Sequence, residues 1–222
     1  MRITGWLSLA LSLLGLAVLA ACNSVPANLP AASGVLQSAA QAMGSVSSTA
    51  FSLQLSGDLS SQFVSTVSGS ISADGQADGS VTIGGQAYPF RLIAGTFYLQ
   101  NPNSSWVTSP PPFDPTQLLD PTNGLASLLT GATGAKTVNQ VGVGGETADE
   151  ITARVPTALI NQLTNLADGQ SSLAATLWIG ATDYRLLQFQ VTFRGPNAQG
   201  DTVAKATLKD FNVPLHVVAP KT

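Results

Sequence analysis

Alternation of apolar and polar side chains is the dominant pattern in the first half of the chain. Phe51, Leu53 and Leu55 alternate with serine and glutamine, which is the period of a strand with one buried face. The same period returns in further segments: 63–71, 81–83, 88–94 and 97–99. The Asp-Gly pairs at 74–75 and 78–79 are typical of hairpin turns. These residues therefore predict an antiparallel meander.

A second group of alternating segments follows in the C-terminal half: 137–143, 150–155, 177–179, 187–193 and 203–209. Together the two groups predict an antiparallel sheet of about nine or ten strands, each apolar on one face. A sheet of that width curls or closes, because the twist of its strands accumulates.

Other segments carry the apolar spacing or the capping residues of helices. Residues 35–43 predict an amphipathic helix with Ser33 as its N-cap, and residues 157–166 predict a short helix. Between them, Asp114 and Asp120 each precede a proline, which predicts two short helices joined by a kink. Helices beside a one-sided sheet pack against its apolar face, so the expected fold class is α+β.

The N-terminus has the layout of an export signal. Arg2 precedes an uncharged apolar run of about 14 to 18 residues, which is short against the roughly 20 needed to cross the hydrocarbon core as a helix. An uncleaved membrane helix is therefore the weaker alternative. The run ends in a sequence that resembles a bacterial lipobox: Leu19, Ala20, Ala21 and Cys22. In a lipobox the thiol receives a diacylglycerol, and cleavage makes the cysteine the first residue.

This interpretation divides the chain into three regions. We expect a signal peptide at 1–21, a flexible tether at 22–34 and a single domain at 35–222. Acylated Cys22 would hold the domain at the cell membrane, lipid-anchored on the extracytoplasmic side.

Composition narrows the classes of function. Charged residues are 9% of the chain against a usual figure of about 25%, while hydrophobic residues are 44%, so the chain is expected to fold. The net charge is −3, and it becomes more negative if Arg2 leaves with the signal peptide. Without a basic patch, nucleic-acid binding is excluded. Cys22 is the only cysteine, so no disulfide is expected to stabilise the domain.

The sequence gives little support for catalysis or for metal binding. His216 is the only histidine and lies close to the C-terminus, and no Gly-x-Ser-x-Gly motif is present. The Asp74 to Gly79 segment lacks the ligand spacing of a calcium loop, and the acidic group at 146–150 is interpreted as a solvated strand start. We therefore expect no catalytic residue, no metal and no cofactor. An exported hydrolase is the weakest alternative.

One-sided apolar strands beside small apolar helices allow two interpretations. The sheet and the helices either meet in a filled core or enclose an apolar cavity that accepts a lipid tail. The period of the strands does not separate these two arrangements.

Two segments resemble the mycobacterial LppX, LprA, LprF and LprG lipoproteins. Residues 113–129 resemble their aspartate-proline segment, and Ala175 to Ile179 with 184–190 resembles two of their strands. The order of lipobox, tether, helix and strands also agrees. This resemblance implies a half-barrel, a strongly curved antiparallel sheet with short helices over its concave face and an apolar cavity between them.

The same resemblance implies a function. Family members carry multi-acyl lipids or glycolipids away from the cytoplasmic membrane, some beside a membrane exporter. We therefore expect a lipid-binding lipoprotein that is not an enzyme. The alternative is a non-catalytic surface lipoprotein with a filled core, either an adhesin or an accessory subunit of an envelope complex.

Apolar residues of the strands and of the 111–131 segment are the candidates for the cavity wall. If the small residues Ala94, Ala204 and Ala206 pack beside the large Phe90, Phe189 and Phe193, they would leave room for acyl chains. The candidates are Phe51, Leu53, Leu55, Phe90, Leu92, Leu118, Leu125, Leu128, Leu187, Phe189, Val191 and Phe193.

Overall fold

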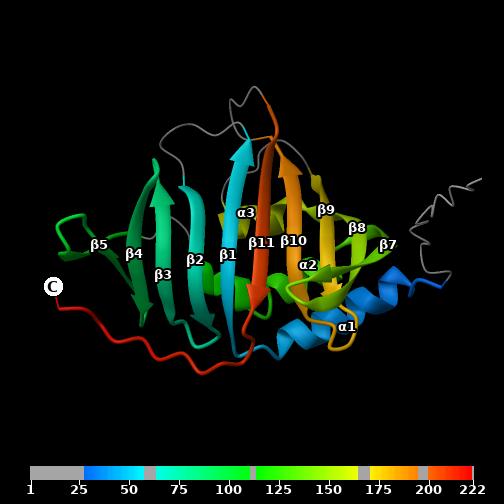
Figure 1. Ribbon diagram of the computed structural model, residues 1–222, viewed down its shortest axis with the longest axis horizontal. Helices are drawn as coiled ribbons and strands as arrows, with labels where there is room; N and C mark the ends of the chain where they lie inside the picture. Colours follow the sequence, from blue (N-terminus) through cyan, green and yellow to red (C-terminus); the bar gives the residue numbers. More distant parts are fainter. Residues whose placement is uncertain (1–27, 58–63, 111–113, 165–170, 195–199, 222) are drawn as a thin grey trace, which may run out of the picture.

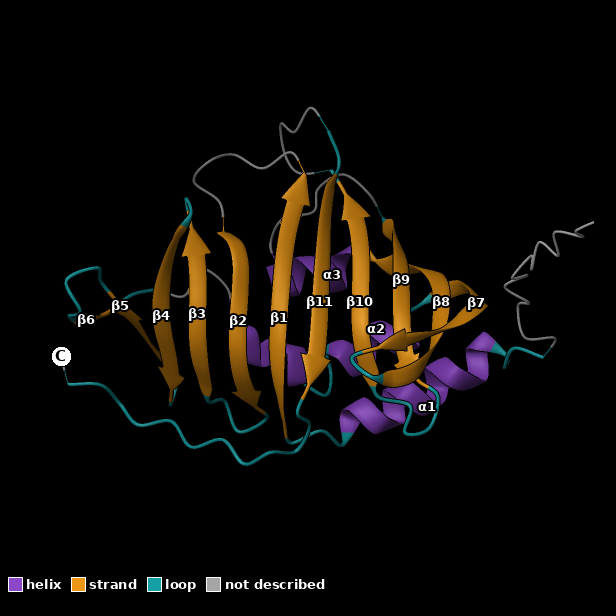
Figure 2. Ribbon diagram, in the orientation of Figure 1, coloured by secondary structure: helices purple, strands orange, loops and turns teal. Residues whose placement is uncertain are grey.

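The computed structural model describes residues 28–57, 64–110, 114–164, 171–194 and 200–221. These residues form one curved antiparallel sheet of 11 strands, with helices on one of its sides (Figure 1, Figure 2). The sheet is open, because β6 and β7 are edge strands that do not pair with one another. The fold is therefore the expected half-barrel. The predicted signal peptide at 1–21 and the lipobox-like sequence that ends at Cys22 lie outside the described residues.

The strands are β1 (Ser48–Gly57), β2 (Val64–Ser72), β3 (Ala77–Ile83), β4 (Gln86–Ile93), β5 (Thr96–Gln100), β6 (Trp106–Thr108), β7 (Thr133–Val143), β8 (Glu146–Pro156), β9 (Ser172–Gly180), β10 (Leu186–Phe193) and β11 (Thr202–Lys209). The helices are α1 (Ala32–Gly44), the 3-10 helix η1 (Pro115–Leu119), α2 (Leu125–Thr130) and α3 (Thr157–Thr164). The strand β6 was not predicted, because three residues are too few to display an alternation.

The strand order explains why helices cover one face. The order is β6-β5-β4-β3-β2-β1-β11-β10-β9-β8-β7, so the chain builds one half outward to β6 and resumes at the opposite edge with β7. The connection from β6 to β7 must cross the whole sheet, and it carries η1 and α2 across the apolar face. The last strand, β11, then returns to the centre and pairs with β1. The helical layer is thus a consequence of topology.

The buried residues of the covered face form continuous rows across the strands. In one row Val81, Val67, Leu53, Ala206 and Phe189 are successive partners in the register from β3 to β10. All but Leu53 are buried, and Leu53 is half-buried. The polar residues between these positions point to the opposite face, which is the alternation that the sequence predicts.

The Asp78-Gly79 pair is not a hairpin, contrary to the prediction. Both residues lie inside β3, and Gly79 is opposite Gly69 on β2 and Phe90 on β4. A Cβ at Gly79 would lie 3.0 Å from the ring of Phe90 and 2.2 Å from the carbonyl oxygen of Ser68. Glycine is therefore required for close approach of the strands, while the true turn uses Asp74 and Gly75.

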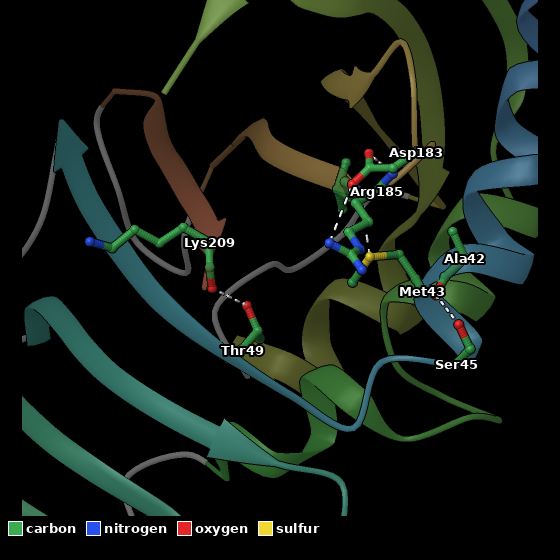
Figure 3. A network of polar contacts seen from close by, with 8 residues as sticks. Ala42, Met43, Ser45, Thr49, Asp183, Arg185 and Lys209 are labelled. Atoms are coloured by element: carbon green, nitrogen blue, oxygen red, sulfur yellow. Dashed lines mark hydrogen bonds and ion pairs between the residues drawn. The ribbon is translucent and has the colours of Figure 1, made fainter. Parts of the chain in front are cut away.

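The first helix is longer than predicted. It begins at Ala32, so residues 32–34 of the expected tether belong to its first turn, and its N-cap is Ala31 without a side-chain hydrogen bond, not Ser33. Its last turn contacts the start of β10, where the backbone amide of Leu186 donates to Met43 Sδ at 3.4 Å. Figure 3 shows Met43 at this contact. Helix α1 is thereby held against the end of the sheet.

The C-terminal segment after β11 runs in extended form along the ends of β1 to β4 (Figure 2). The Asn212 amide donates to the Ser48 carbonyl at 2.8 Å, and the Val217 amide donates to Gln76 Oε1 at 2.9 Å. His216 is exposed on this segment. The segment therefore ties together strands that lie far apart in the sequence.

Candidate functional site

An apolar cavity lies between the centre of the sheet and the helical layer. Its floor comes from β1, β10 and β11, and its roof comes from η1 and α3. The lining residues are Phe51, Leu53, Asp114, Pro115, Leu118, Ile160, Phe189, Val191, Ala204 and Ala206. Asp114 is the only charged residue among them.

Two alanines create the space in the floor. Ala204 and Ala206 are consecutive inward-facing residues of β11, which lies next to the central strand β1. On one side Ala206 is paired with Leu53 and on the other with Phe189, and Ala204 is paired with Val191. A short side chain between long ones leaves a notch along β11. The cavity occupies this notch.

The roof depends on a short capped helix. The Asp114 Oδ1 atom accepts hydrogen bonds from the Thr116 amide at 3.0 Å and from Thr116 Oγ1 at 2.6 Å. Asp114 is thus the N-cap of η1, with Pro115 at the first position, as the sequence predicts. This cap directs Pro115 and Leu118 toward the cavity, and Ile160 of α3 completes the roof.

The second predicted cap acts differently. Asp120 accepts hydrogen bonds from the amides of Thr122 and Asn123 at 2.9 and 2.7 Å, so it closes a turn rather than beginning a helix. Helix α2 begins five residues later, with Gly124 as its N-cap. A Cβ at Gly124 would lie 2.5 to 2.7 Å from three carbonyl oxygens of the preceding turn. Only glycine fits this joint between η1 and α2.

The cavity is small in this conformation. The space open to the centres of water-sized spheres is about 30 Å³. One water needs about 10 to 15 Å³ measured in that way, so the space corresponds to about two water molecules. A methylene group is of similar size, so a long acyl chain needs several times this room. The roof must separate from the floor before such a chain enters.

Five of the twelve candidate residues line the cavity: Phe51, Leu53, Leu118, Phe189 and Val191. The other seven are buried elsewhere: Leu55, Phe90, Leu92, Leu125, Leu128, Leu187 and Phe193. Phe90 stacks on Phe97 with 5.5 Å between ring centroids, in the half of the sheet formed by β2 to β5. Leu125 and Leu128 are the buried face of α2.

Leu187 is displaced by an irregularity in β10. The register with β9 shifts between Leu186 and Gln188, so the simple alternation fails at this point. As a result, Leu186 joins the main hydrophobic cluster, and Leu187 is buried outside it. A shift of one residue changes the face of a side chain, and the sequence carries no sign of it.

Some lining residues were not among the candidates. Ile160 is one apolar residue of a short helix, and Pro115 was read only as a helix start. Ala204 and Ala206 were expected to leave room, and the structure places both in the cavity floor. Ala94, named with them, instead lies in the β4–β5 turn with a φ of +48°.

The acidic group at 146–150 includes one buried carboxylate. Asp149 is 2% exposed and accepts a hydrogen bond from Gln140 Nε2 at 2.7 Å, so the expected solvated strand start is wrong for this residue.

Within the described ranges, no three His, Cys, Asp or Glu side chains group as metal ligands. No helix in the described part of the chain is long and apolar enough to span a membrane.

Comparisons with known proteins identify similar sequences. A sequence model of the LppX_LprAFG lipoprotein family matches residues 31–217. A relative from Mycobacterium leprae, named lipoarabinomannan carrier protein LprG, is 26% identical over 221 residues, which cover 92% of this chain and 90% of the relative. The protein of the same name from Mycolicibacterium hassiacum is 28% identical over 229 residues, which cover 96% of each chain.

Two solved mycobacterial structures share this fold. LprF from Mycobacterium bovis has a TM-score of 0.74 at 19% identity and covers 86% of this chain and 97% of its own. LppX from Mycobacterium tuberculosis has a TM-score of 0.64 at 17% identity and covers 84% and 98%. These likenesses establish the shared curved antiparallel sheet.

Proposed function

The chain belongs to the LppX_LprAFG lipoprotein family, and we propose that it binds the acyl chains of a lipid or glycolipid in the cavity over β11. We further propose that it carries this cargo away from the cytoplasmic membrane, as a carrier and not as an enzyme. The names of its LprG relatives, which are carrier proteins, support this reading.

The observation that carries the proposal is the apolar notch on β11. Nine of the ten lining residues are apolar. The short side chains of Ala204 and Ala206 leave space in the floor, because the residues paired with them on the neighbouring strands are leucine, valine and phenylalanine. A filled core has no need of such a notch, because interiors pack as densely as organic crystals. A lipid carrier needs it as the starting point of a binding site.

Cargo entry depends on movement of the roof. The floor is a continuous sheet, whereas η1, α2 and α3 contain five, six and eight residues. Helices this short derive their stability from packing rather than from propensity, so they are the part that moves at least cost. We propose that acyl chains displace η1 and α3 and then contact Phe51, Leu53, Phe189 and Val191.

The energetic benefit of such a site is large. Exposing one methylene group to water costs about 0.8 kcal/mol, so about ten methylenes cost on the order of 8 kcal/mol. An apolar lining replaces water around the chain and lowers the barrier to leaving the bilayer. The acyl groups on Cys22 would keep the cavity within reach of the membrane that supplies the cargo, and a membrane exporter is the partner that would deliver it.

The alternative, a non-catalytic surface lipoprotein with a filled core, has one observation in its favour. The cavity holds only about two water molecules in this conformation. The apolar face of α2 is also buried: Leu125, Leu128 and Leu129 are each at most 1% exposed.

Native mass spectrometry of the protein purified from its own membranes distinguishes the two. The carrier proposal expects a second mass increment, beyond the acyl groups on Cys22, that organic solvent extracts as lipid. A purified protein that carries only its own acyl groups, and that takes up no lipid from vesicles, would contradict the carrier proposal and support the alternative.

A further inference from the structure

The chain enters the domain at one end of the sheet. Residues 28–31 precede α1, and the Pro30 carbonyl oxygen accepts a hydrogen bond from Thr137 Oγ1 on β7 at 2.8 Å. Figure 2 shows α1 beginning beside β7 at one end of the molecule, with β6 and the C-terminus at the other end. The entry point is thus fixed to β7, an edge strand of the sheet.

The length of chain before this contact limits how far β7 can lie from an acyl anchor. Pro30 is eight residues after Cys22, and a fully extended chain spans at most about 3.6 Å per residue, so the two residues are at most about 29 Å apart. Neighbouring strands are spaced by about 4.8 Å, so β6 lies about 48 Å from β7 along the curved sheet. An anchor at Cys22 therefore keeps β7 near the bilayer, whereas β6 can lie much farther away.

The surface around the entry point suits anionic lipid headgroups. Helix α1 contains no charged residue, and residues 121–145 contain one, Lys136, which is exposed on β7. Val138, on the same strand, is 40% exposed. On the neighbouring strand β8, Asp149 is buried and Glu150 is half-buried. A surface with an exposed lysine and few exposed carboxylates is attracted to an anionic bilayer, although the whole chain has a net charge of −3.

The opposite edge is the rival surface, because it carries a tryptophan. Trp106 on β6 is half-buried, and tryptophan is enriched where proteins meet the interface between membrane and water. The guanidinium carbon of Arg91, however, lies 5.0 Å from the centroid of this ring, and Arg91 also forms an ion pair with Asp78 at 3.0 Å. The tryptophan ring is therefore already engaged by a cation within the protein.

We propose that the β7 edge, together with the start of α1, rests on the membrane surface with Lys136 at the lipid headgroups, and that the β6 edge points away from the membrane. This inference rests on the proposed function, because it takes acylated Cys22 as the anchor. The cavity floor begins at β10, three strands from β7 or about 14 Å along the sheet. In this orientation the cavity is nearer to the bilayer than β2 to β6 are, so cargo has a short path to it.

The test places one fluorescent reporter on each edge strand. Val138 on β7 and Val107 on β6 are 40% and 37% exposed, so Val138→Cys and Val107→Cys are matched sites for a maleimide dye. The acylated full chain, in which the Cys22 thiol does not react, is reconstituted in vesicles of phosphatidylcholine and phosphatidylglycerol with a nitroxide on some headgroups. We expect the nitroxide to quench the Val138 dye about threefold more than the Val107 dye, because the two edges lie so far apart.

Lys136→Glu tests the contribution of charge to this contact. The variant should lower quenching of the Val138 dye about twofold in the anionic vesicles and leave it unchanged in vesicles of phosphatidylcholine alone. Lys205→Glu is its control, because Lys205 is exposed on β11, four strands away from β7, and this variant should leave the quenching unchanged. Equal quenching in Lys136→Glu and the unsubstituted protein would overturn the placement of Lys136 at the headgroups.

The outcomes separate the orientation from the carrier function. Equal quenching at the two edges, or stronger quenching at Val107, would overturn the inference. Mass spectrometry of lipid extracted from the same protein reports the cargo: loaded lipid with equal quenching rejects only the orientation, whereas unequal quenching without any loaded lipid rejects the carrier function. A protein that carbonate washes off the vesicles would overturn the acyl anchor and the inference together.

Discussion

Filling the notch in β11 tests whether the cavity is a genuine gap. Val191 on β10 has an alanine partner on each side, Ala204 on β11 and Ala175 on β9. Ala204 lines the cavity, but Ala175, 5% exposed, does not. The substitutions Ala204→Val and Ala175→Val therefore add the same two methyl groups to the same face of the same sheet. Their difference isolates the effect of the cavity from the strand propensity of valine.

The two variants should change stability in opposite directions. Burial of two methyl groups in unfilled space stabilises by at most about 1.6 kcal/mol, so we expect Ala204→Val to raise the free energy of unfolding by about 0.5 to 1.5 kcal/mol. Ala175→Val adds volume to a filled region and should lower it by about 1 to 3 kcal/mol. Urea unfolding followed by circular dichroism should separate the two midpoints by about 0.5 M or more.

Cargo loading supplies the second readout. Ala204→Val should load less lipid because the floor is raised, whereas folded Ala175→Val should load as the wild type does. If both variants lose the same stability, the notch is packed like the rest of the core. That result would refute the reasoning from β11 and favour the surface lipoprotein with a filled core.

Three further changes test other parts of the protein. Cys22→Ala should release the protein from membranes that have been washed with carbonate, and retention would contradict acyl anchoring. Gly124→Ala should lower the free energy of unfolding by about 1 to 3 kcal/mol, because its Cβ would collide with three carbonyl oxygens. Gly142→Ala, where nothing lies within 4 Å of the added Cβ, is its control and should stay within about 0.5 kcal/mol in urea unfolding. Between pH 5 and pH 2, Asp74→Asn should lose less stability than the wild type, as measured by the urea midpoints at the two pH values. An equal loss in both proteins would contradict a stabilising role for the charged Asp74 carboxylate.

The sign of the Asp74 effect follows from its hydrogen bonds. Side chains of Ser72 and, more weakly, Gln76 donate to the carboxylate, and they lower the pKa of Asp74 below its usual value. A lowered pKa in the folded state means that the charged form is the stabilising one. Its contribution is complete above the unfolded pKa of about 3.9 and is lost as the pH falls through the folded pKa.

The alternation of the strands could be read from the sequence because it is local. Phe51, Leu53 and Leu55 lie two residues apart, and a strand with one buried face imposes that period wherever it lies in the sheet. The prolines after Asp114 and Asp120 also act locally, which is why the sequence located η1. The lipobox ending at Cys22 is a contiguous motif, and its prediction likewise depends on no tertiary contact.

The position of the cavity was decided by the tertiary structure. Leu118 and Leu128 are both cavity-wall candidates from the 111–131 segment, yet only Leu118 faces the notch, because the connection from β6 to β7 crosses the sheet at one particular place. The register between strands placed Ala206 between Leu53 and Phe189, and Ala204 beside Val191. An irregularity in β10 removed Leu187 from the main cluster. Periodicity fixes which face a side chain occupies, but only long-range packing determines what lies opposite it.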